Sequence, residues 1–343
     1  MKLLSSAIQL PQRLVPSTEL DQQHGLETGQ TAKHFLIDQR YYASGDETAD
    51  KLGAMALTKA LGIADLRIED LDCVIAACAT SAQAIPYNAA SIYRHMGSNR
   101  PIHTFDVGMT CLSFLQALDV ANLYLSSGRY KRLAIVSTEV ASVGLNHQHL
   151  ESASIFGDGA VAYVFERELW SLAQGSGGST ALSFGVKNVC FETVHEAYDF
   201  CEIRAGGSTR HISKATTPEQ LDQYRLDATF RMDGKRLYKH VLKEFRPFVD
   251  ACLDRAGMEM EDIDLVIPHQ ASGHGLKHVQ RLLEVGDDRF FNVFSQYGNQ
   301  VAASIPLALN KAIEQGRVKR GNRVLLLGTS AGMSYGSVIV EIR

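Results

Sequence analysis

The sequence predicts an α/β protein made of two related halves, and three observations support this fold class. Some apolar runs are uninterrupted, such as Cys73 to Cys78, which is typical of a strand in a parallel sheet covered by helices on both faces. Between such runs, apolar residues recur every three or four positions, as they do in amphipathic helices. The order of these elements in the first half of the chain then recurs in the second half.

The first half alternates strands and helices. After an N-terminal strand we expect a polar, irregular stretch from Leu20 to Tyr42, and then a helix from Asp46 to Leu61 that stops at Gly62. The remaining expected elements are a strand over Cys73–Cys78, a helix over Ala89–Met96 that stops at Gly97, a strand over His103–Val107, a helix that starts near Cys111, and strands over Leu133–Ser137 and Ala160–Phe165.

Four segments of the second half match segments of the first half. They are Glu261–Ile267 with Glu69–Ile75 at an offset of 192, Gln315–Arg320 with Ser127–Arg132 at 188, Arg323–Leu327 with Arg132–Val136 at 191, and Ser337–Glu341 with Ala160–Glu166. The Gly- and Ser-rich stretch from Ser171 to Thr180 is the best candidate for a linker. We therefore expect an N-terminal half over residues 1–170 and a C-terminal half over residues 171–343.

Cys111 lies where a strand, a glycine and a helix start follow one another. The strand His103–Val107 ends before Gly108, and the periodic helix begins near Cys111. The first N–H groups of a helix have no internal partner, and the helix dipole is positive there, so a thiolate or an oxyanion at this position is stabilised. We expect Cys111 to be a nucleophile, although a cysteine that only fills a Leu-rich core is the alternative at this point.

Two residues of the second half are expected to join Cys111. Adding 188 to 111 leads to Asn299, which also follows a glycine and precedes an apolar helix. His269 directly follows the strand Leu265–Pro268, and ligands of α/β proteins gather at the carboxyl ends of strands. The alternatives are a histidine that is satisfied within a turn and an asparagine that caps a helix.

Composition excludes several classes of function. The 34 Lys and Arg residues against 38 Asp and Glu give a net charge of −4, so we expect no nucleic-acid partner. No apolar run reaches the roughly 20 residues that span a bilayer, and the N-terminus is a poor signal peptide. The six cysteines have no CxxC spacing, which argues against a zinc site and a disulfide framework, and no GxGxxG motif follows an early strand. We expect a cytoplasmic protein that binds neither membranes nor dinucleotides.

Five motifs resemble those of one family. They are Asp106–Cys111 (DVGMTC), Phe156–Ala160 (FGDGA), Pro268–Ala271 (PHQA), Gly298–Asn299 with Ala302–Pro306 (AASIP), and Ala331–Gly336 (AGMSYG). With these motifs the chain is similar to thiolase-fold condensing enzymes of the β-ketoacyl-acyl-carrier-protein synthase III group, from about Thr48 to Arg343. The resemblance implies a thiolase-like, five-layered αβαβα fold with two duplicated halves, and a homodimer.

The resemblance also implies a mechanism. Cys111 would accept an acyl group from a thioester of acyl carrier protein or coenzyme A, with the oxyanion held by the N–H groups of Cys111 and Gly332. A decarboxylative Claisen condensation with a malonyl-type or β-keto thioester would follow, with His269 and Asn299 as donors to the enolate oxygen. No cofactor and no metal are required. The regions Ile85–Asn88 and Val189–Tyr224 would line the acyl tunnel and its entrance.

Departures from the family pattern bear on the substrate. The segment Gln30–Arg40 has no Trp, His34 stands in place of one Arg that binds coenzyme A, Leu150 stands in place of another, and the single Trp of the chain is Trp170. These departures favour specialised polyketide or fatty-acid-derived metabolism over a starter condensation with acetyl coenzyme A. Two alternatives stay open: an acyltransferase of the same fold that acylates an alcohol or an amine, and a non-catalytic partner subunit.

Overall fold

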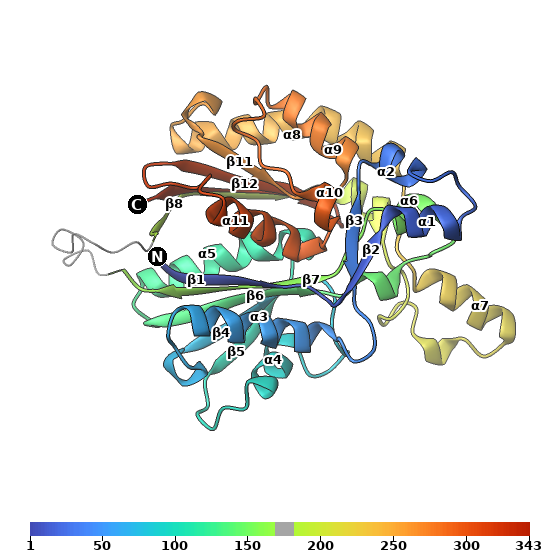
Figure 1. Cartoon of the computed structure of the whole chain (residues 1–343), viewed down its shortest axis with the longest axis horizontal. Helices are drawn as coiled ribbons and strands as arrows, with labels where there is room; N and C mark the ends of the chain where they lie inside the picture. Colours follow the sequence, from blue (N-terminus) through green and yellow to red (C-terminus); the bar gives the residue numbers. More distant parts are fainter. Residues whose placement is uncertain (169–181) are drawn as a thin grey trace.

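Two β-sheets and three layers of helices are stacked alternately in the computed structural model of the chain (Figure 1). The structure describes residues 1–168 and 182–343. The predicted linker Ser171–Thr180, Trp170 and the predicted boundary between residues 170 and 171 lie outside the described residues. The alternation of two sheets with three layers of helices confirms the five-layered thiolase-like fold expected from the sequence.

The N-terminal sheet has the strand order β1-β7-β6-β4-β5. Its strands are β1 (Lys2–Gln9), β4 (Cys73–Ala77), β5 (His103–Val107), β6 (Arg132–Glu139) and β7 (Gly159–Glu166). β4 is parallel to β5 and β6, whereas β7 is antiparallel to β1 and β6. Every residue of β4 is buried, as its uninterrupted apolar run predicts.

The C-terminal sheet repeats this arrangement with the order β11-β12-β13-β8. Its strands are β8 (Phe184–Thr193), β11 (Leu265–Pro268), β12 (Arg323–Ser330) and β13 (Ser334–Ile342). β11 and β12 are parallel, and the other two pairs are antiparallel, as in the series β4-β6-β7-β1 of the first sheet. The duplication predicted from the sequence is thus present in four strands of each sheet, whereas β5 has no counterpart among the strands within residues 182–343.

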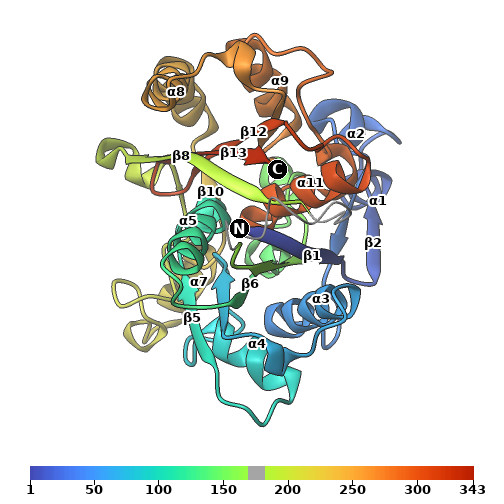
Figure 2. The ribbon, with the colours of Figure 1, turned by 90° about the vertical axis from the view of Figure 1, so that its left-hand side faces the viewer.

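Helices cover both faces of each sheet, as the end-on view shows (Figure 2). The outer helices of the N-terminal half are α3 (Ala49–Ile63) and α4 (Asn88–Met96), and those of the C-terminal half are α8 (Gly234–Ala256) and α9 (Gly273–Leu282). The middle layer consists of α5 (Ser113–Ser126) and α11 (Ser304–Glu314), which lie between the two sheets. α11 is buried on nearly all sides, because a helix between two sheets has no face left for water.

The stretch Leu20–Tyr42 was expected to be irregular, and this expectation is wrong. It contains the end of α1 (Ser17–Gln23), α2 (Gln30–Phe35) and β3 (Gln39–Tyr42), which pairs with β2 (Arg13–Pro16). The two helices are too short to show an apolar period, and a buried carboxylate joins them: Asp21 accepts hydrogen bonds from the backbone N–H groups of Gly29 and Thr31 at 2.7 and 2.8 Å. Tertiary contacts rather than local pattern therefore organise this stretch.

Glycine was expected to end two helices, and it ends one of them. Gly97 caps α4 in a left-handed conformation with φ +67°, whereas Gly62 lies inside α3, which continues to Ile63.

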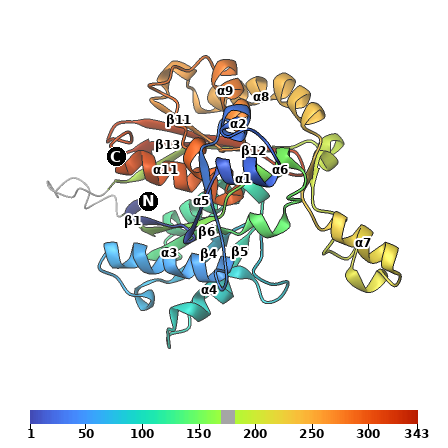
Figure 3. The same ribbon diagram turned by 45° about the vertical axis from the view of Figure 1, so that its right-hand side comes forward.

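The remaining elements are short: β9 (Cys201–Glu202), β10 (Arg231–Met232), α6 (Leu150–Ala153), α7 (Pro218–Asp227) and α10 (Phe294–Tyr297). α7 extends away from the layered body (Figure 3).

Candidate active site

Cys111 lies in a 3₁₀ turn, Thr110–Leu112, between β5 and α5. The turn is held by Ser113, whose Oγ accepts the N–H of Met109 at 2.9 Å and donates to the carbonyl oxygen of Thr110 at 2.7 Å. Thr110 has a φ of +45°, a conformation that costs free energy for a residue with a side chain. Cys111 therefore precedes the regular helix by two residues, on a tightly bonded loop.

Leu112 docks this turn against the C-terminal sheet. A Cβ added to Gly336 of β13 would lie 2.9 Å from Leu112 Cδ1, and one added to Gly328 of β12 would lie 3.4 Å from Leu112 Cδ2. Two glycines thus leave the space that Leu112 fills. This packing brings the nucleophile of the first half to strands of the second half.

The Cys111 thiol is not the stabilised thiolate that its position suggested. Burial raises the pKa of Cys111 to about 12, and the nearby Glu139 carboxyl and Cys201 thiol act in the same direction. The backbone N–H groups of Ala331 and Cys111 oppose this shift of the pKa. The expectation failed because loss of hydration outweighs the few amides that face the sulfur. Cys111 is a thiol at neutral pH.

The second amide at Cys111 belongs to Ala331, one residue before the predicted donor Gly332. Ala331 directly follows β12, and Thr110 Oγ1 donates to its carbonyl oxygen at 3.4 Å. Gly332 has a φ of +82°, which gives the chain its turn between β12 and β13. The amide of Gly332 stays a prediction, and that of Ala331 is the one that interacts with the sulfur.

His269 follows β11 at the carboxyl end of the strand. Its side chain is buried, its backbone N–H donates to the carbonyl oxygen of Leu327 at 2.8 Å, and burial lowers its pKa to about 4. The imidazole is therefore neutral at physiological pH. Within the described residues its Nδ1 has no hydrogen-bond partner. A neutral ring can donate from one nitrogen and accept at the other.

Asn299 has a fixed amide orientation. Its Oδ1 accepts hydrogen bonds from the backbone N–H of Val301 at 2.8 Å and from Ser304 Oγ at 3.4 Å, and its Nδ2 donates to the carbonyl oxygen of Ala271 at 3.3 Å. Since an amide nitrogen has two hydrogens, one remains available for a ligand. Asn299 caps the turn that follows it, and its amide nitrogen bonds Ala271, two residues after His269.

The offset of 188 that led to Asn299 is not the structural register of the two halves. The middle helices begin at Ser113 and Ser304, which gives 304 − 113 = 191. Thr110 and Val301 share a positive φ at this offset, and Ser304 Oγ accepts the N–H of Gln300 at 2.9 Å as Ser113 accepts that of Met109. Cys111 therefore corresponds to Ala302, and Asn299 to Gly108. The site is built asymmetrically on a duplicated frame.

The motif Phe156–Gly159 holds the Asn299 backbone. Asn299 N–H donates to the carbonyl oxygen of Ile155 at 2.7 Å, and Gly157 N–H donates to that of Asn299 at 3.0 Å. A Cβ at Gly157 would collide with the carbonyl oxygen of Tyr297. Asp158 is buried and accepts hydrogen bonds from Ala43 N–H, Ser142 N–H and Ser142 Oγ at 2.8, 2.9 and 2.6 Å. These contacts account for the motif without a direct chemical role.

The segments that carry the three predicted residues lie close together at the carboxyl ends of the strands. The Cys111 turn contacts β12 and the turn Val301–Ala303, and Leu112 and His269 both lie against Gly328. Sequence reasoning missed Glu139, which ends β6 and lies next to Cys111. Its signal was present, since a charged residue at the carboxyl end of an apolar strand is unusual unless it has partners.

Comparisons with known proteins identify the family. Two family models match the chain: 3-oxoacyl-[acyl-carrier-protein] synthase III over residues 105–183, and its C-terminal counterpart over residues 253–342. The β-ketoacyl-[acyl-carrier-protein] synthase III of Bartonella bacilliformis is 31% identical and covers 89% of this chain and 88% of its own length. That of Allorhizobium ampelinum is 30% identical, with 97% and 96% covered. The chain belongs to the 3-oxoacyl-[acyl-carrier-protein] synthase III family.

Solved structures of this family share the fold. The synthase III of Aquifex aeolicus has a TM-score of 0.82 at 24% identity, with 99% of both chains covered. A variant of Xanthomonas campestris OleA has a TM-score of 0.80 at 21% identity, with 99% of this chain and 98% of that chain covered. These two structures confirm the thiolase fold, and the family membership shown by the relatives confirms the resemblance read from the motifs.

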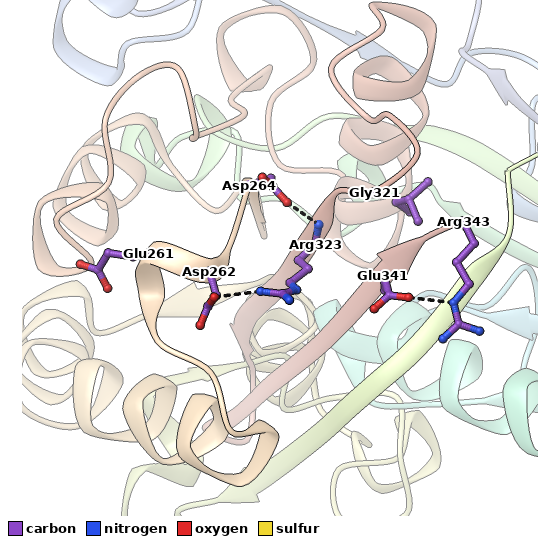
Figure 4. Close-up of a pocket in the computed structure, with 8 residues that line it drawn as sticks. Glu261, Asp262, Asp264, Gly321, Arg323, Glu341 and Arg343 are labelled. Atoms are coloured by element: carbon purple, nitrogen blue, oxygen red, sulfur yellow. Dashed lines mark hydrogen bonds and ion pairs between the residues drawn. The ribbon is translucent and has the colours of Figure 1, made fainter.

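A charged hollow of about 580 Å³ lies at the opposite ends of the strands that carry the site (Figure 4). Asp264 precedes β11 and Arg323 begins β12, whereas His269 and Ala331 follow these strands. The Arg323 guanidinium donates to Asp262 at 2.9 Å, and the Arg323 backbone N–H donates to Asp264 at 2.7 Å. In this family member the charged groups of the hollow therefore bond one another, at the strand ends opposite Cys111.

Every helix within residues 1–168 and 182–343 is too short or too polar to cross a membrane.

Proposed function

We propose that the protein is a β-ketoacyl synthase of type III in which Cys111, His269 and Asn299 are the catalytic residues. The observation that carries this proposal is the orientation of Asn299, whose oxygen is occupied by Val301 and Ser304 and whose Nδ2 donates to the carbonyl oxygen of Ala271, two residues after the neutral His269. Two neutral N–H donors are suited to a developing enolate oxygen, because they stabilise negative charge without carrying a charge of their own.

In the first half-reaction the Cys111 sulfur attacks the carbonyl carbon of an acyl thioester. The tetrahedral oxyanion is held by the backbone N–H groups of Cys111 and Gly332, the two predicted donors, whereas the amides of Ala331 and Cys111 interact with the resting sulfur. When the C–S bond to the carrier breaks, the carrier leaves as a thiol with the proton that Cys111 gives up. The product is an acyl-cysteine.

In the second half-reaction a malonyl-type thioester loses carbon dioxide, and the electrons of the broken C–C bond form an enolate. His269 and Asn299 donate to the enolate oxygen. The enolate carbon attacks the acyl-cysteine carbonyl, a C–C bond forms, and Cys111 leaves and recovers a proton. The second substrate is either this malonyl-type thioester or a β-keto thioester.

The substrates that we propose are thioesters of acyl carrier protein or coenzyme A. In support, Phe200 lines a hollow of about 690 Å³. The next residue, Cys201, has a thiol that acts on the pKa of Cys111. The basic residues of the hollow are Arg204, Arg231, Lys235 and Arg236, and its acidic residues are Glu151, Asp199 and Asp233. The excess of cationic side chains suits the phosphate groups of both carriers.

We propose a homodimer formed through β5. This strand pairs only with β4, so that one edge is unpaired within residues 1–168 and 182–343, and no residue of it is buried. The neighbouring loop exposes Ile85 and Tyr87, at 85% and 47% of their surface. An exposed edge strand beside apolar side chains is a template for pairing with a second chain.

The two half-reactions can be separated by experiment. Cys111 is loaded with a panel of acyl thioesters, the intact protein is weighed, malonyl thioester is added, and carbon dioxide and product are followed. Cys111→Ala is expected to gain no acyl mass. Asn299→Ala is expected to be acylated normally but to release carbon dioxide about 10²–10³-fold more slowly. Asn322→Ala, directly before β12 at the strand ends opposite the site, is the matched control.

Two outcomes would replace this proposal. Transfer of the acyl group to an alcohol or an amine without carbon dioxide release would indicate an acyltransferase. Acylation of a thiol other than Cys111, with the Cys111→Ala protein still folded, would remove the nucleophile from its role.

A further inference from the structure

Arg40 is a buried cation that the mechanism above does not use. It lies in β3, and no part of its surface is exposed. Within residues 1–168 and 182–343 its Nε and Nη1 atoms have no hydrogen-bond partner. A buried charge with so few partners costs free energy, and an apolar side chain of similar size would avoid that cost. Packing alone therefore does not explain an arginine at this position.

The third nitrogen of the guanidinium, Nη2, joins β3 to the end of α6. It donates to the carbonyl oxygen of Ser154 at 2.7 Å and to Ser17 Oγ at 3.0 Å. Ser154 directly follows α6, so the helix leaves its carbonyl oxygen without a partner. Tyr42, on the same face of β3, donates to the preceding carbonyl oxygen, that of Ala153, at 2.9 Å. Because the Arg40 donor is charged, its bond is roughly twice as strong as a neutral one.

The carbonyl group after that of Ser154 is the one that holds Asn299. The Asn299 N–H donates to the carbonyl oxygen of Ile155 at 2.7 Å. A Cβ at Gly298 would lie 2.8 Å from the same oxygen. A single residue step thus separates the oxygen that Arg40 binds from the oxygen that Asn299 binds. A shift of Ser154 would be passed on to the backbone of Asn299.

A second path leads from Arg40 to the same place through Ser17. Ser17 Oγ donates to the carbonyl oxygen of Ile37 at 2.5 Å, and Ile37 Cδ1 would lie 3.1 Å from a Cβ at Gly298. Gly298 has a φ of +67°, which a residue with a side chain rarely adopts. In Figure 1, β3 passes beside α10, the helix that ends directly before Gly298. Arg40 therefore supports Gly298 and Asn299 from two sides.

We propose that Arg40 is a positioning residue for the second half-reaction: it fixes the backbone of Ser154 and Ile155, and with it the direction in which Asn299 donates to the enolate oxygen. The inference rests on the proposed role of Asn299. The Cys111 turn is held by other bonds, those of Ser113 Oγ. Acylation of Cys111 should therefore not depend on Arg40.

The test measures the two half-reactions separately in Arg40→Met, which removes the donors and keeps the length of the side chain. The acyl thioester is the one from the panel above that loads native Cys111 fastest. We expect acylation near the native rate and carbon dioxide release slower by about 10- to 10²-fold, since a displacement of about 1 Å has an effect of this size. Arg40→Lys keeps the charge and a donor, so it should recover most of the rate.

Tyr42→Phe is the matched control for Arg40→Met. It also removes a hydrogen bond from β3 to the end of α6, but that bond goes to Ala153, which is not adjacent to Ile155. We expect both half-reactions of Tyr42→Phe near the native rates. A loss of carbon dioxide release as large as that of Arg40→Met would indicate general loosening and would overturn the inference.

A double variant separates positioning of Asn299 from general support of the fold. Once the Asn299 amide is removed, Arg40 has nothing left to position. Arg40→Met combined with Asn299→Ala should therefore release carbon dioxide at the rate of Asn299→Ala alone. Two independent losses would multiply instead, and that result would contradict the proposal.

Hydrogen–deuterium exchange gives a readout that needs no activity. A peptide over residues 294–304 should exchange faster in Arg40→Met than in the native protein, and a peptide over α3 should not. Ser17→Ala is the second variant, for the case that Arg40→Met does not fold. It breaks the path through Ile37, so it should speed exchange over residues 294–304 and slow carbon dioxide release by about tenfold.

Native exchange over residues 294–304 in a folded Arg40→Met protein would overturn the inference, and so would an equal slowing of both half-reactions. For Ser17→Ala, native exchange together with a native rate has the same meaning. Failure of the proposed function gives a different result: Cys111 would accept no acyl group from any thioester, while exchange over residues 294–304 would still depend on Arg40.

Discussion

Gly328 and His269 face each other so closely that a Cβ at position 328 would lie 2.6 Å from the Cβ of His269. Gly328 is in β12 and His269 follows the neighbouring strand β11, so the glycine fixes how near the imidazole lies to the strand. The same glycine gives room to Leu112, next to Cys111. One missing side chain thus sets the position of two of the three proposed catalytic residues.

Gly328→Ala should therefore displace His269 and slow the release of carbon dioxide by about 10²-fold, since an error of about 1 Å in a catalytic group has an effect of this size. The rate is measured after Cys111 has been loaded with an acyl group. Gly62→Ala is the control, because Gly62 lies in α3 with no atom near its added Cβ. Equal rates for Gly328→Ala and the native protein would contradict the prediction.

Stability should depend on pH through two buried groups with opposite signs. The pKa of His269 is lowered from 6.5 to about 4, so between these values the unfolded chain binds the extra proton and stability is lost as the pH falls. The pKa of Glu139 is raised from 4.5 to about 7, so the folded state holds the proton and stability is lost as the pH rises from about 4.5 to 7. Each window is worth about 3 kcal/mol.

Because the two effects oppose each other, the native protein should show a shallow dependence over this range. His269→Gln should become less stable as the pH rises from about 4.5 to 7, and Glu139→Gln should become more stable, each by up to about 3 kcal/mol. Urea unfolding at a series of pH values measures these slopes. Parallel profiles for the two variants would show that neither pKa is shifted as described.

Asp158→Ala should destabilise the fold by about 3 kcal/mol, because it leaves the buried N–H groups of Ala43 and Ser142 without their acceptor. Asp222→Ala is the matched control, since Asp222 is exposed and pairs with Arg225 on the surface of α7. Thermal and urea unfolding give the difference between the variants. A loss below about 1 kcal/mol for Asp158→Ala would mean that water replaces the carboxylate.

Sedimentation at micromolar concentration should give twice the mass of the chain, since β5 offers an unpaired edge beside exposed apolar residues. Ile85→Asp should shift the equilibrium toward the monomer, because it places a charge in the proposed interface. Ile63→Asp, at the exposed end of α3, should not. A native protein that is monomeric and still active would exclude the dimer as a requirement.

Local pattern alone determined much of this protein. The apolar run of β4, the alternation of strands with helices and the left-handed stop at Gly97 depend on residues next to one another, and the sequence states them directly. The motifs around Cys111, His269 and Asn299 also placed these residues at turns after strands or before helices. The structure places all three at such turns, and their catalytic roles remain predictions.

Only the tertiary structure decided the chemistry at Cys111. Loss of hydration and the charge of Glu139, which is 139 − 111 = 28 residues away in sequence, reverse the effect expected from a helix start, and Ala331 turns its amide to the sulfur. The register of 191, which pairs Cys111 with Ala302, depends on where both middle helices begin in three dimensions. Burial and charge proximity are sums over all neighbours in space, and a sequence pattern reports only the neighbours along the chain.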